Sequence, residues 1–476
     1  MFLDPQRLPK PVFDKFFLHT ERLVYPEVPK DGVLFKYPGH SNGPASGMKV
    51  LFLVHDTTAC GHYRGKYPGM VLASQGAQVI VKIVVQDAPL KYTDVLDIEY
   101  IVLQRAVQCV APKCFSMCQT LSKIFGTTIV YDLDDYLHGI NQESPAYAVY
   151  NPNTNLGQES LLSVENYLSN VDGVIYSTRE LQAAYKSKTK FSHVLTNGLD
   201  FSLGDRDWDL SAPKYSWREF ADEQGVKYDN DTLLFGWSGS PTHKMDLSVL
   251  GSAVTRILEL APNTLFGMQT DPTLAARFCL EHKVPLDRVV YIPVIQFKDY
   301  PRTLSGYDVA LCPLDSTRFN FCKSDLRILD HSYWGVPYVA SKVANFWRFH
   351  LDSKGQGGYM AESQSDFIKY TVKLLTDEQD RKTKGNFIGN YIRENYDIRS
   401  TMGSYAYTLR AIKASRHGQL MLPSMTEVLD TLHKVPQMNK SVGKSDPCPC
   451  GSGYPYKKCK NSCYPAFGVS RQIRKT

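Results

Sequence analysis

The sequence predicts an α/β protein made of two doubly wound, Rossmann-like domains, followed by a small zinc-binding segment near the C-terminus. Three observations support this class. Short apolar runs that end in turn residues alternate with helical segments along residues 48–205, and the same alternation returns along residues 233–390. Such alternation is typical of parallel βαβ units. Within residues 445–464, four closely spaced cysteines replace the alternation.

Size and composition agree with more than one hydrophobic core. The chain has 476 residues, of which 43% are hydrophobic and 12% aromatic, and a single core rarely serves so long a chain. The formal net charge is +6, which fits an anionic substrate or nucleic acid but is too small to establish either.

The sequence also favours a cytoplasmic location. No apolar run reaches the ~18 residues that span a bilayer, and the N-terminus lacks the apolar core of a signal peptide. We therefore expect no transmembrane segment and a cytoplasmic location, in a host cytoplasm if the protein is viral, with its eleven cysteines largely reduced.

The first domain is expected to begin at Met48. The preceding extension, residues 1–47, is rich in proline and glycine, and we expect it to wrap the surface of this domain. A glycine-bearing turn that follows a first strand brings backbone N–H groups close to a ligand, so Gly61 is a candidate binding residue. The expected elements are a strand at Lys49–His55, a turn at Thr57–Gly61, a helix from Arg64 to about Ser74 and a strand at Ala77–Val85.

Carboxylates follow the strand expected at Thr127–Tyr131. Asp134 and Asp135 fall at the C-terminal end of a parallel strand, where ligands bind in such sheets. We interpret them, with His138 and Arg64, as catalytic groups on the acceptor side. A metal-holding Asp-x-Asp is an alternative that the second nucleotide-type domain argues against, and capping of the next helix explains the acids equally well.

The second domain opens with a candidate diphosphate site. Ser238, Gly239 and Ser240 follow a strand expected at Leu233–Trp237, and Lys244 comes shortly after. Small residues let the backbone approach a diphosphate, and a lysine adds a full positive charge.

A strand–loop–helix–strand unit over Gly306–Ser341 supplies the rest of this candidate site. We expect strands at Tyr307–Leu314 and Pro337–Ser341, with a helix from Asp325 between them that Ser324 caps. Lys323 and Ser324 lie at the helix N-terminus, where a phosphate can bind. Asp330 can accept hydrogen bonds from ribose hydroxyls. Phosphate and ribose together indicate a nucleotide.

These motifs resemble the donor-binding half of GT-B glycosyltransferases, particularly family four. Asp330 stands five positions before Gly335-Val336-Pro337, as an acidic residue does in that family. The family's second acid, eight residues upstream, is replaced here by Cys322, and Lys323-Ser324 is similar to a variant of the pattern. Gly61-His62-Tyr63-Arg64 also resembles the opening loop where acceptor and donor meet. The resemblance implies a nucleotide diphosphate sugar donor such as a UDP-sugar, retention of configuration and no catalytic metal.

The remaining segments connect these parts. A long helical stretch is expected from Asp366 to about Arg393, and in GT-B enzymes the last helix returns to the first domain. The expected connecting segments are an inter-domain linker at 206–232, the returning helix at 391–416, a helical linker at 417–444 and a basic tail at 465–476.

The C-terminal segment carries Cys448, Cys450, Cys459 and Cys463. Four thiolates at these spacings can hold one tetrahedral zinc ion, and so short a segment has no core to hold it otherwise. Disulfides are the alternative. The stretch resembles the SEC-C motif, except that Lys460 stands where that motif has its fourth ligand. The resemblance implies docking to a protein or a nucleic acid.

The sequence thus predicts a nucleotide-sugar-dependent glycosyltransferase. The chain also resembles enzymes of this general build that glycosylate hydroxymethylated bases in viral DNA. Its basic balance, its Lys/Arg-rich tail and the expected zinc segment favour that acceptor, double-stranded DNA. A surface polysaccharide or a lipid-linked glycan is the alternative acceptor. Because Cys322 stands where the family has an acid, a third hypothesis stays open: the protein is a non-catalytic GT-B-like binding protein.

Overall fold

The computed structural model describes residues 8–18, 29–40, 42–54, 56–83, 90–105, 112–201, 203, 214–295 and 299–416. The four cysteines expected to bind zinc and the basic tail lie outside these residues. The chain forms two compact units. The N-terminal unit comprises residues 27–140, 146–197 and 398 onward, and the C-terminal unit comprises residues 1–26, 141–145 and 198–397.

The N-terminal unit is built on a seven-stranded sheet of order β1-β3-β2-β4-β5-β6-β7. Its strands are parallel except for β1, which pairs antiparallel with β3. The carboxyl ends of β2, β4, β5 and β6 therefore meet at one edge. The strands are β1 Val33–Tyr37, β2 Lys49–Val54, β3 Gln78–Ile83, β4 Tyr100–Gln104, β5 Thr128–Leu133, β6 Gly173–Tyr176 and β7 Ser192–Val194.

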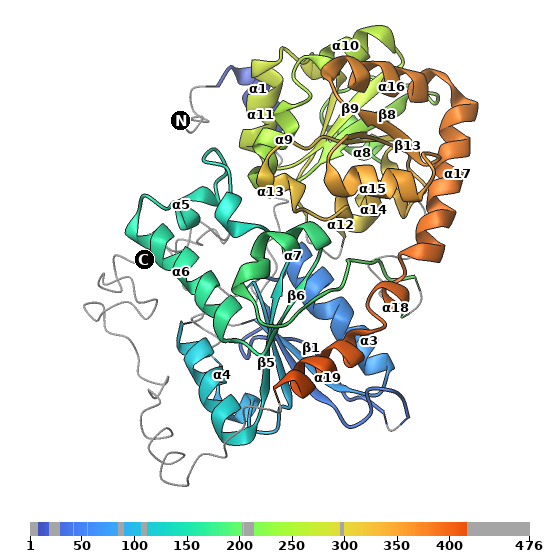
Figure 1. Cartoon of the computed structure of the whole chain (residues 1–476). Helices are drawn as coiled ribbons and strands as arrows, with labels where there is room; N and C mark the ends of the chain where they lie inside the picture. The colour runs from blue at the N-terminus through green and yellow to red at the C-terminus, as the bar shows by residue number, and fades with distance from the viewer. Residues whose placement is uncertain are drawn as a thin grey trace. The chain divides into compact units, whose positions relative to one another are not determined.

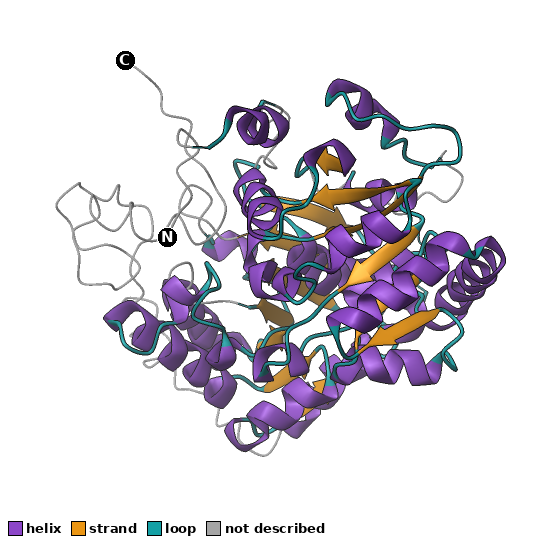
Figure 2. Cartoon of the chain, turned by 90° about the horizontal axis from the view of Figure 1, so that it is seen from above, coloured by secondary structure: helices purple, strands orange, loops and turns teal. Residues whose placement is uncertain are grey.

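Helices lie beside the strands of the described chain (Figure 2). α19 packs on α3 and β5, so this last described helix belongs to the N-terminal unit. The helices are α2 Ala59–Gly61, a π-helical turn His62–Lys66, α3 Tyr67–Ser74, α4 Pro112–Phe125, α5 Tyr147–Tyr150, α6 Asn155–Asn170, α7 Arg179–Tyr185, α18 Ile398–Thr401 and α19 Tyr405–Ser415.

The turn predicted at Thr57–Gly61 is wrong, because the helix starts at Ala59. The Asp56 carboxylate accepts hydrogen bonds from the backbone N–H of Thr58, at 2.8 Å, and of Gly61, at 3.2 Å. Asp56 thus satisfies N–H groups that a helix start leaves free, and the helix begins almost directly after β2.

The C-terminal unit contains a six-stranded, fully parallel sheet of order β10-β9-β8-β11-β12-β13. The strands are β8 Leu233–Ser238, β9 Thr264–Gln269, β10 Val289–Ile292, β11 Val309–Cys312, β12 Tyr338–Ser341 and β13 Gly358–Ala361. The helices are α1 Lys10–Phe17, α8 Arg218–Glu223, α9 Lys244–Ser248, α10 Ala253–Leu260, α11 Pro272–Glu281, α12 Tyr300–Thr303, α13 Arg318–Phe321, α14 Leu326–Ser332, α15 Ala344–Asp352, α16 Gln364–Thr376 and α17 Glu378–Asn395.

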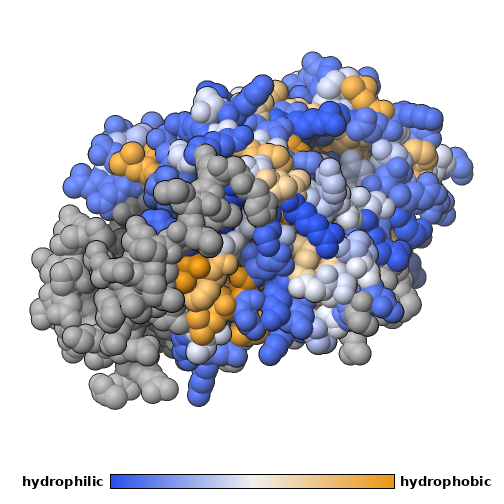
Figure 3. Space-filling view, turned by 60° about the horizontal axis from the view of Figure 1, so that its bottom comes forward, coloured by the Kyte–Doolittle hydropathy of each residue, from blue (hydrophilic) through white to orange (hydrophobic). Residues whose placement is uncertain are grey.

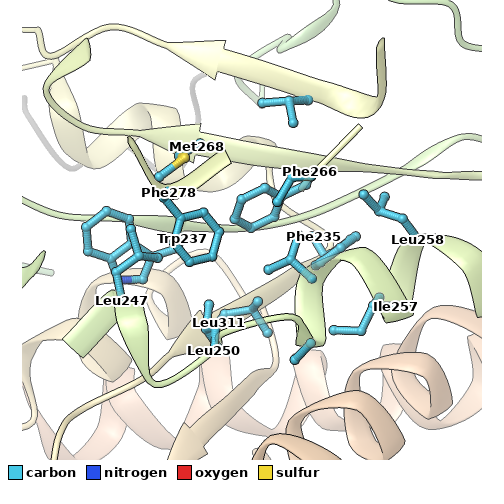
Figure 4. Close-up of a cluster of buried hydrophobic side chains, with 14 of the residues drawn as sticks. Phe235, Trp237, Leu247, Leu250, Ile257, Leu258, Phe266, Met268, Phe278 and Leu311 are labelled. Atoms are coloured by element: carbon cyan, nitrogen blue, oxygen red, sulfur yellow. The ribbon is translucent and has the colours of Figure 1, made fainter. Parts of the chain in front are cut away.

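A large apolar core fixes β8 and β9, the strands that lead to the candidate site. Phe235 and Trp237 of β8 and Phe266 and Met268 of β9 are fully buried, and they lie among aliphatic and aromatic side chains of the neighbouring helices (Figure 4). A parallel strand covered on both faces needs such a continuous apolar run. The end of β8 is therefore held rigidly.

The N-terminal extension differs from the expectation. It was expected to wrap the first domain, yet α1 packs beside α11 in the C-terminal unit (Figure 1). Phe16 of α1 is fully buried, and its ring meets that of Tyr291 edge-on at 5.3 Å. Val12 and Phe16, one helical turn apart, form the apolar stripe that docks. The later part of the extension, from residue 27 and including β1, belongs to the N-terminal unit.

Two helix boundaries also differ from those predicted. The single helix expected from Asp366 to Arg393 is divided between α16 and α17 at Asp377, whose side chain accepts a hydrogen bond from the N–H of Asp380 at 2.9 Å. Such a cap starts a new helix. Ser324 does not cap α14, because Asp325 occupies the cap position and makes no side-chain cap bond there.

The surface is mixed in character. The face drawn in Figure 3 is mainly hydrophilic, with apolar residues in separate groups. Among the described helices, none combines the length and the apolar character needed to cross a bilayer.

Candidate functional site

The carboxyl end of β8 carries the predicted Ser-Gly-Ser turn of the C-terminal unit. Ser238 is buried, and its hydroxyl lies 3.4 Å from both the Tyr300 hydroxyl and His331 Nε2. Ser240 is exposed, and its hydroxyl lies 2.6 Å from that of Thr242. The two serines therefore differ: the first belongs to a buried polar cluster, and the second faces solvent.

Gly239 lies between them in a crowded position. A Cβ at this residue would come within 2.6 Å of the Trp237 ring and 3.1 Å of Arg327 Nη1. The missing side chain lets the backbone turn pass directly beside an arginine. This arginine was not among the predicted site residues.

Arg327 extends from α14, and its guanidinium lies 5.3 Å from the centre of the Trp237 ring. Nη1 is buried and makes no hydrogen bond in the described part of the chain. One feature of the sequence could have identified Arg327 as a site residue. It stands three residues before Asp330, and this spacing places both on one side of a helix.

Two histidines near this arginine are neutral at pH 7. Burial, and then the charge of Arg327, lower the pKa of His243 to about 4 and that of His331 to about 3. His243 Nδ1 lies 2.6 Å from Asp246 Oδ2, and the other carboxylate oxygen of Asp246 accepts from the Asp315 N–H at 3.0 Å. The carboxylate of Asp246 is therefore already engaged.

The two predicted lysines have different surroundings. Lys244 follows it in sequence, and the charge of Lys323 helps to lower the pKa of His243. Lys244 Nζ lies 2.6 Å from Glu143 Oε2, within the C-terminal unit, and both side chains are partly exposed. Lys323 Nζ lies 4.6 Å from the centre of the Phe319 ring.

Asp330 is buried within α14. Its charge acts on Tyr300, whose pKa is raised first by burial and then by this carboxylate. Cys322, where the family pattern has an acid, is also buried, and Ser324 is half-buried. The structure thus brings Ser238, Gly239, Lys323 and Asp330 to one end of the C-terminal sheet.

The predicted residues of the N-terminal unit separate into different environments. Arg64 is 1% exposed and Asp132 is fully buried. The Arg64 guanidinium donates to both carboxylate oxygens of Asp132, at 2.7 and 2.8 Å, and to Leu195 O at 2.7 Å and Asn197 Oδ1 at 3.0 Å. Arg64 is therefore a core cation that joins β5 to the chain after β7. The structure does not bring it to solvent.

Asp134 and Asp135 follow β5 and are held together by Arg105, which sequence reasoning missed. Arg105 Nε lies 3.0 Å from Asp134 Oδ1, and Nη2 pairs with Asp135. The Arg105 backbone has φ of +44°, which is unusual for a side chain of this kind and stores strain. The carboxyl ends of the neighbouring strands β4 and β5 create this cluster, which no local pattern reveals.

His138 and Gly61 are both occupied within the unit. His138 Nδ1 lies 2.9 Å from the Tyr185 hydroxyl, and Nε2 lies 3.3 Å from Glu165 Oε1. Burial lowers the pKa of His138, so the ring is neutral at pH 7. The Gly61 N–H donates to Asp56. Within the described chain, His138 and Gly61 therefore bond to residues other than Arg105.

The described residues contain no group of three or more His, Cys, Asp or Glu side chains placed to hold a metal ion. This finding concerns neither the four tail cysteines nor any other residue outside the described ranges.

Comparison with known proteins gives limited sequence similarity. No family model matches the chain. A curated relative, the SecA protein translocase subunit of Elusimicrobium minutum, is 34% identical over 77 residues, which make up 14% of this chain and 9% of that protein. The chain therefore spans under a tenth of that relative's length.

Solved structures give broader similarity. Sucrose-phosphate synthase from Thermosynechococcus elongatus superposes with a TM-score of 0.54 at 12% identity, covering 77% of this chain and 100% of that one. Anabaena HepE in complex with UDP-glucose gives 0.54 at 15% identity, covering 76% and 100%. WaaG, a glycosyltransferase of lipopolysaccharide biosynthesis, gives 0.51 at 13%, covering 76% and 99%.

At such identities the likeness concerns the fold. The described chain has two parallel-sheet, Rossmann-like units, as predicted, and its solved neighbours have the same architecture. The protein therefore has the GT-B fold.

Proposed function

We propose that the protein is a glycosyltransferase that moves a sugar from a nucleotide diphosphate sugar, such as a UDP-sugar, to a hydroxyl group. The observation that carries this proposal is the Ser238–Ser240 turn at the carboxyl end of β8, where the Gly239 backbone passes so close to Arg327 that a Cβ would lie 3.1 Å from Nη1. Ligands bind at this end of the strands in doubly wound sheets. UDP-glucose is bound in the Anabaena HepE structure, and this supports a related donor here.

The proposed roles follow from charge and position. Lys244, Lys323 and the Ser238–Ser240 turn approach the diphosphate, and Asp330 accepts hydrogen bonds from the ribose. As the bond from the sugar C1 to the phosphate oxygen breaks, the cations stabilise the negative charge that develops on the leaving group. The acceptor oxygen forms the new bond to C1, with retention, and its proton passes to the leaving diphosphate.

The binding step can be tested by calorimetric titration of UDP and UDP-glucose into Lys244→Ala and Lys323→Ala. We expect each change to weaken binding by about 1–3 kcal/mol, the range for hydrogen bonds to charged groups. Lys342→Ala is the matched control, since Lys342 pairs with Glu362 in the same unit. Wild-type affinity in both site variants would exclude the assignment.

For the acceptor we propose a hydroxymethylated base in double-stranded DNA, with Asp134 and Asp135 on the acceptor side. The support is compositional: a net charge of +6 and a tail rich in lysine and arginine, which favour polyanions. The test incubates the protein and UDP-sugars with hydroxymethylated duplexes, unmodified duplexes or a lipid-linked glycan, with mass spectrometry as the readout. Transfer to the glycan alone would replace the DNA proposal.

A second candidate function is a GT-B-like protein that binds a nucleotide without transferring sugar. The buried thiol of Cys322, at the position of a family acid, favours it. Slow release of free sugar from UDP-glucose by the wild type, lost in Lys323→Ala, would support the enzyme. Nucleotide binding without hydrolysis or transfer would support the binding protein.

For the tail we propose one structural zinc ion held by Cys448, Cys450, Cys459 and Cys463. The support is the spacing and the chemistry of the four thiolates, and the proposed role is docking to a partner.

A further inference from the structure

Arg327 is charged, and part of its head group is out of contact with water. Its Nη1 atom is buried and has no hydrogen-bond partner among the described residues. The guanidinium lies 5.3 Å from the centre of the Trp237 ring. A buried donor without a hydrogen-bond partner is costly, and each such group calls for an explanation.

Neighbouring polar groups do not supply a hydrogen bond to Nη1 within the described residues. Asp246 is engaged by His243, by the Asp315 N–H and by the side chain of Asn320. The charge of Arg327 helps to lower the pKa of Asp246, and both Arg327 and Asp330 act on the Tyr300 hydroxyl. Carboxylates therefore lie near Arg327, yet within the described chain Nη1 has no hydrogen-bond acceptor.

Other unsatisfied groups lie beside the arginine. Trp237 Nε1 and His331 Nδ1 are also buried without a hydrogen-bond partner in the described part of the chain. The indole nitrogen can only donate. Gly239 passes so close to Nη1 that a Cβ there would lie 3.1 Å from it. Glycine thus keeps this side of the guanidinium clear of a side chain.

We propose that Arg327 binds an anionic oxygen of the nucleotide sugar, in the first place a phosphate oxygen of the diphosphate, beside Gly239. This inference rests on the proposed function and adds a residue to its site. Arg327 is one turn before Asp330 on α14, so a single helix would present a cation to the phosphate and an acceptor to the ribose. An acidic group on the sugar is the other source of the same chemistry.

A structural role gives a different expectation. If Arg327 served to stabilise the unit through its contact with Trp237, its loss would lower the melting temperature. If it awaits an anion, the ligand-free protein tolerates an uncompensated charge, and replacement by an apolar side chain of similar length leaves the melting temperature unchanged or raises it.

The test uses the full-length chain with Arg327→Met and Arg327→Lys, and Arg256→Met as the control. Arg256 pairs with Glu259 on the exposed face of α10. Thermal melts without ligand are followed by titrations with UDP, UMP, uridine, UDP-glucose, UDP-glucuronate and pyrophosphate. We expect Arg327→Met to melt no lower than the wild type, to bind UDP at least tenfold more weakly and to bind uridine as before. Arg327→Lys should bind UDP with intermediate affinity.

The outcomes separate this inference from the proposed function. Unchanged UDP affinity in Arg327→Met, or a lower melting temperature without a loss of affinity, overturns the inference and leaves the function standing. A wild type that binds pyrophosphate through Arg327 but no nucleotide overturns the function and keeps the anion site. A loss confined to UDP-glucuronate keeps the site and assigns its anion to the sugar.

Discussion

Two arginines with buried nitrogen atoms distinguish the two units at the scale of single residues. In the N-terminal unit, Arg64 has four hydrogen bonds to Asp132, Leu195 and Asn197. In the C-terminal unit, Arg327 has a buried Nη1 without a partner in the described residues. A buried charge that the protein itself neutralises serves stability, whereas one left without a partner is better suited to a ligand.

Replacement of Arg64 by methionine should therefore destabilise the N-terminal unit by about 3–5 kcal/mol, since it leaves the buried Asp132 carboxylate without its cation. All five tryptophans fall within residues 198–397. We therefore expect the loss of stability to appear when denaturant unfolding is monitored by far-UV circular dichroism. The unfolding transition monitored by tryptophan fluorescence should change little. The double variant Arg64→Leu/Asp132→Leu, which removes both charges, should recover part of the stability. A loss below about 1 kcal/mol in Arg64→Met, the size typical of surface pairs, would contradict the role as a core cation.

The pair between Lys244 and Glu143 leads to a second prediction. Glu143 competes with a donor phosphate for the same ammonium group, and the two side chains are 28% and 55% exposed. Glu143→Gln should therefore tighten UDP binding by about two- to fivefold, a change within the range of exposed ion pairs. Glu362→Gln, which breaks the similar pair with Lys342, is the control for titration calorimetry. Equal affinities in all three proteins would show that the pair does not compete with the donor.

Single residues were predictable where the motif is local in sequence. Gly239, Lys244 and Asp330 belong to short patterns that follow strands or begin helices. Arg105 could not be found this way, because its role depends on β4 lying beside β5. Arg64 was misjudged for the same reason: its partners come from distant segments, and a local pattern does not reveal burial.

At the scale of elements, the strands were the easiest to predict. Buried parallel strands need continuous apolar runs, and those expected at Thr127–Tyr131, Leu233–Trp237 and Pro337–Ser341 appear in the structure close to their expected bounds. The position of α1 was not predictable, since an apolar stripe at helical spacing does not specify the surface that it covers.

Phe16→Ala tests this placement of α1. Removal of a fully buried phenylalanine should destabilise the C-terminal unit by about 3–5 kcal/mol. Tryptophan fluorescence should detect the change, because all five tryptophans belong to this unit. Phe13→Ala is a milder control, since Phe13 is only partly buried. If Phe16→Ala left the fluorescence transition in place, α1 would not contribute to this unit in solution.

The start of α14 predicts a pH dependence of stability. Burial raises the pKa of Asp325 from its ordinary value near 3.8 to about 6, and the Tyr396 hydroxyl donates to it at 3.3 Å. The folded state thus holds a proton that the unfolded state releases, so this contribution to stability is complete below about pH 4 and is lost as pH rises through about 6. Relative to Asp325→Asn, the wild type should lose about 2 kcal/mol between pH 4 and 7 in urea unfolding. A difference between the two proteins that does not vary with pH would contradict the shift.

At the scale of the whole molecule, the two units have separate sheets, and their unfolding need not be one transition. Multidomain chains often depart from two-state behaviour. Circular dichroism reports both units, whereas tryptophan fluorescence reports the C-terminal unit. The comparison of these two signals separates effects on each unit, as the variants of Arg64 and Phe16 require.

The tail belongs to the same scale, because it is the part of the chain expected to act on a partner. Purified full-length protein should contain about one equivalent of zinc, by the four-thiolate argument, and Cys459→Ser should lose it. Since Cys459 lies outside both described sheets, this variant should bind UDP as the wild type does. Absence of metal in the wild type, or loss of UDP binding in Cys459→Ser, would contradict a separate zinc segment.

If the acceptor is DNA, lysines and arginines release counterions from phosphates on binding, so affinity falls as salt rises. Removal of residues 445–476, which include Lys457, Lys458 and Arg474, should weaken DNA binding at low salt and flatten its salt dependence. An identical salt slope with and without these residues would place the DNA contacts elsewhere, and no DNA binding even at low salt would favour the glycan acceptor.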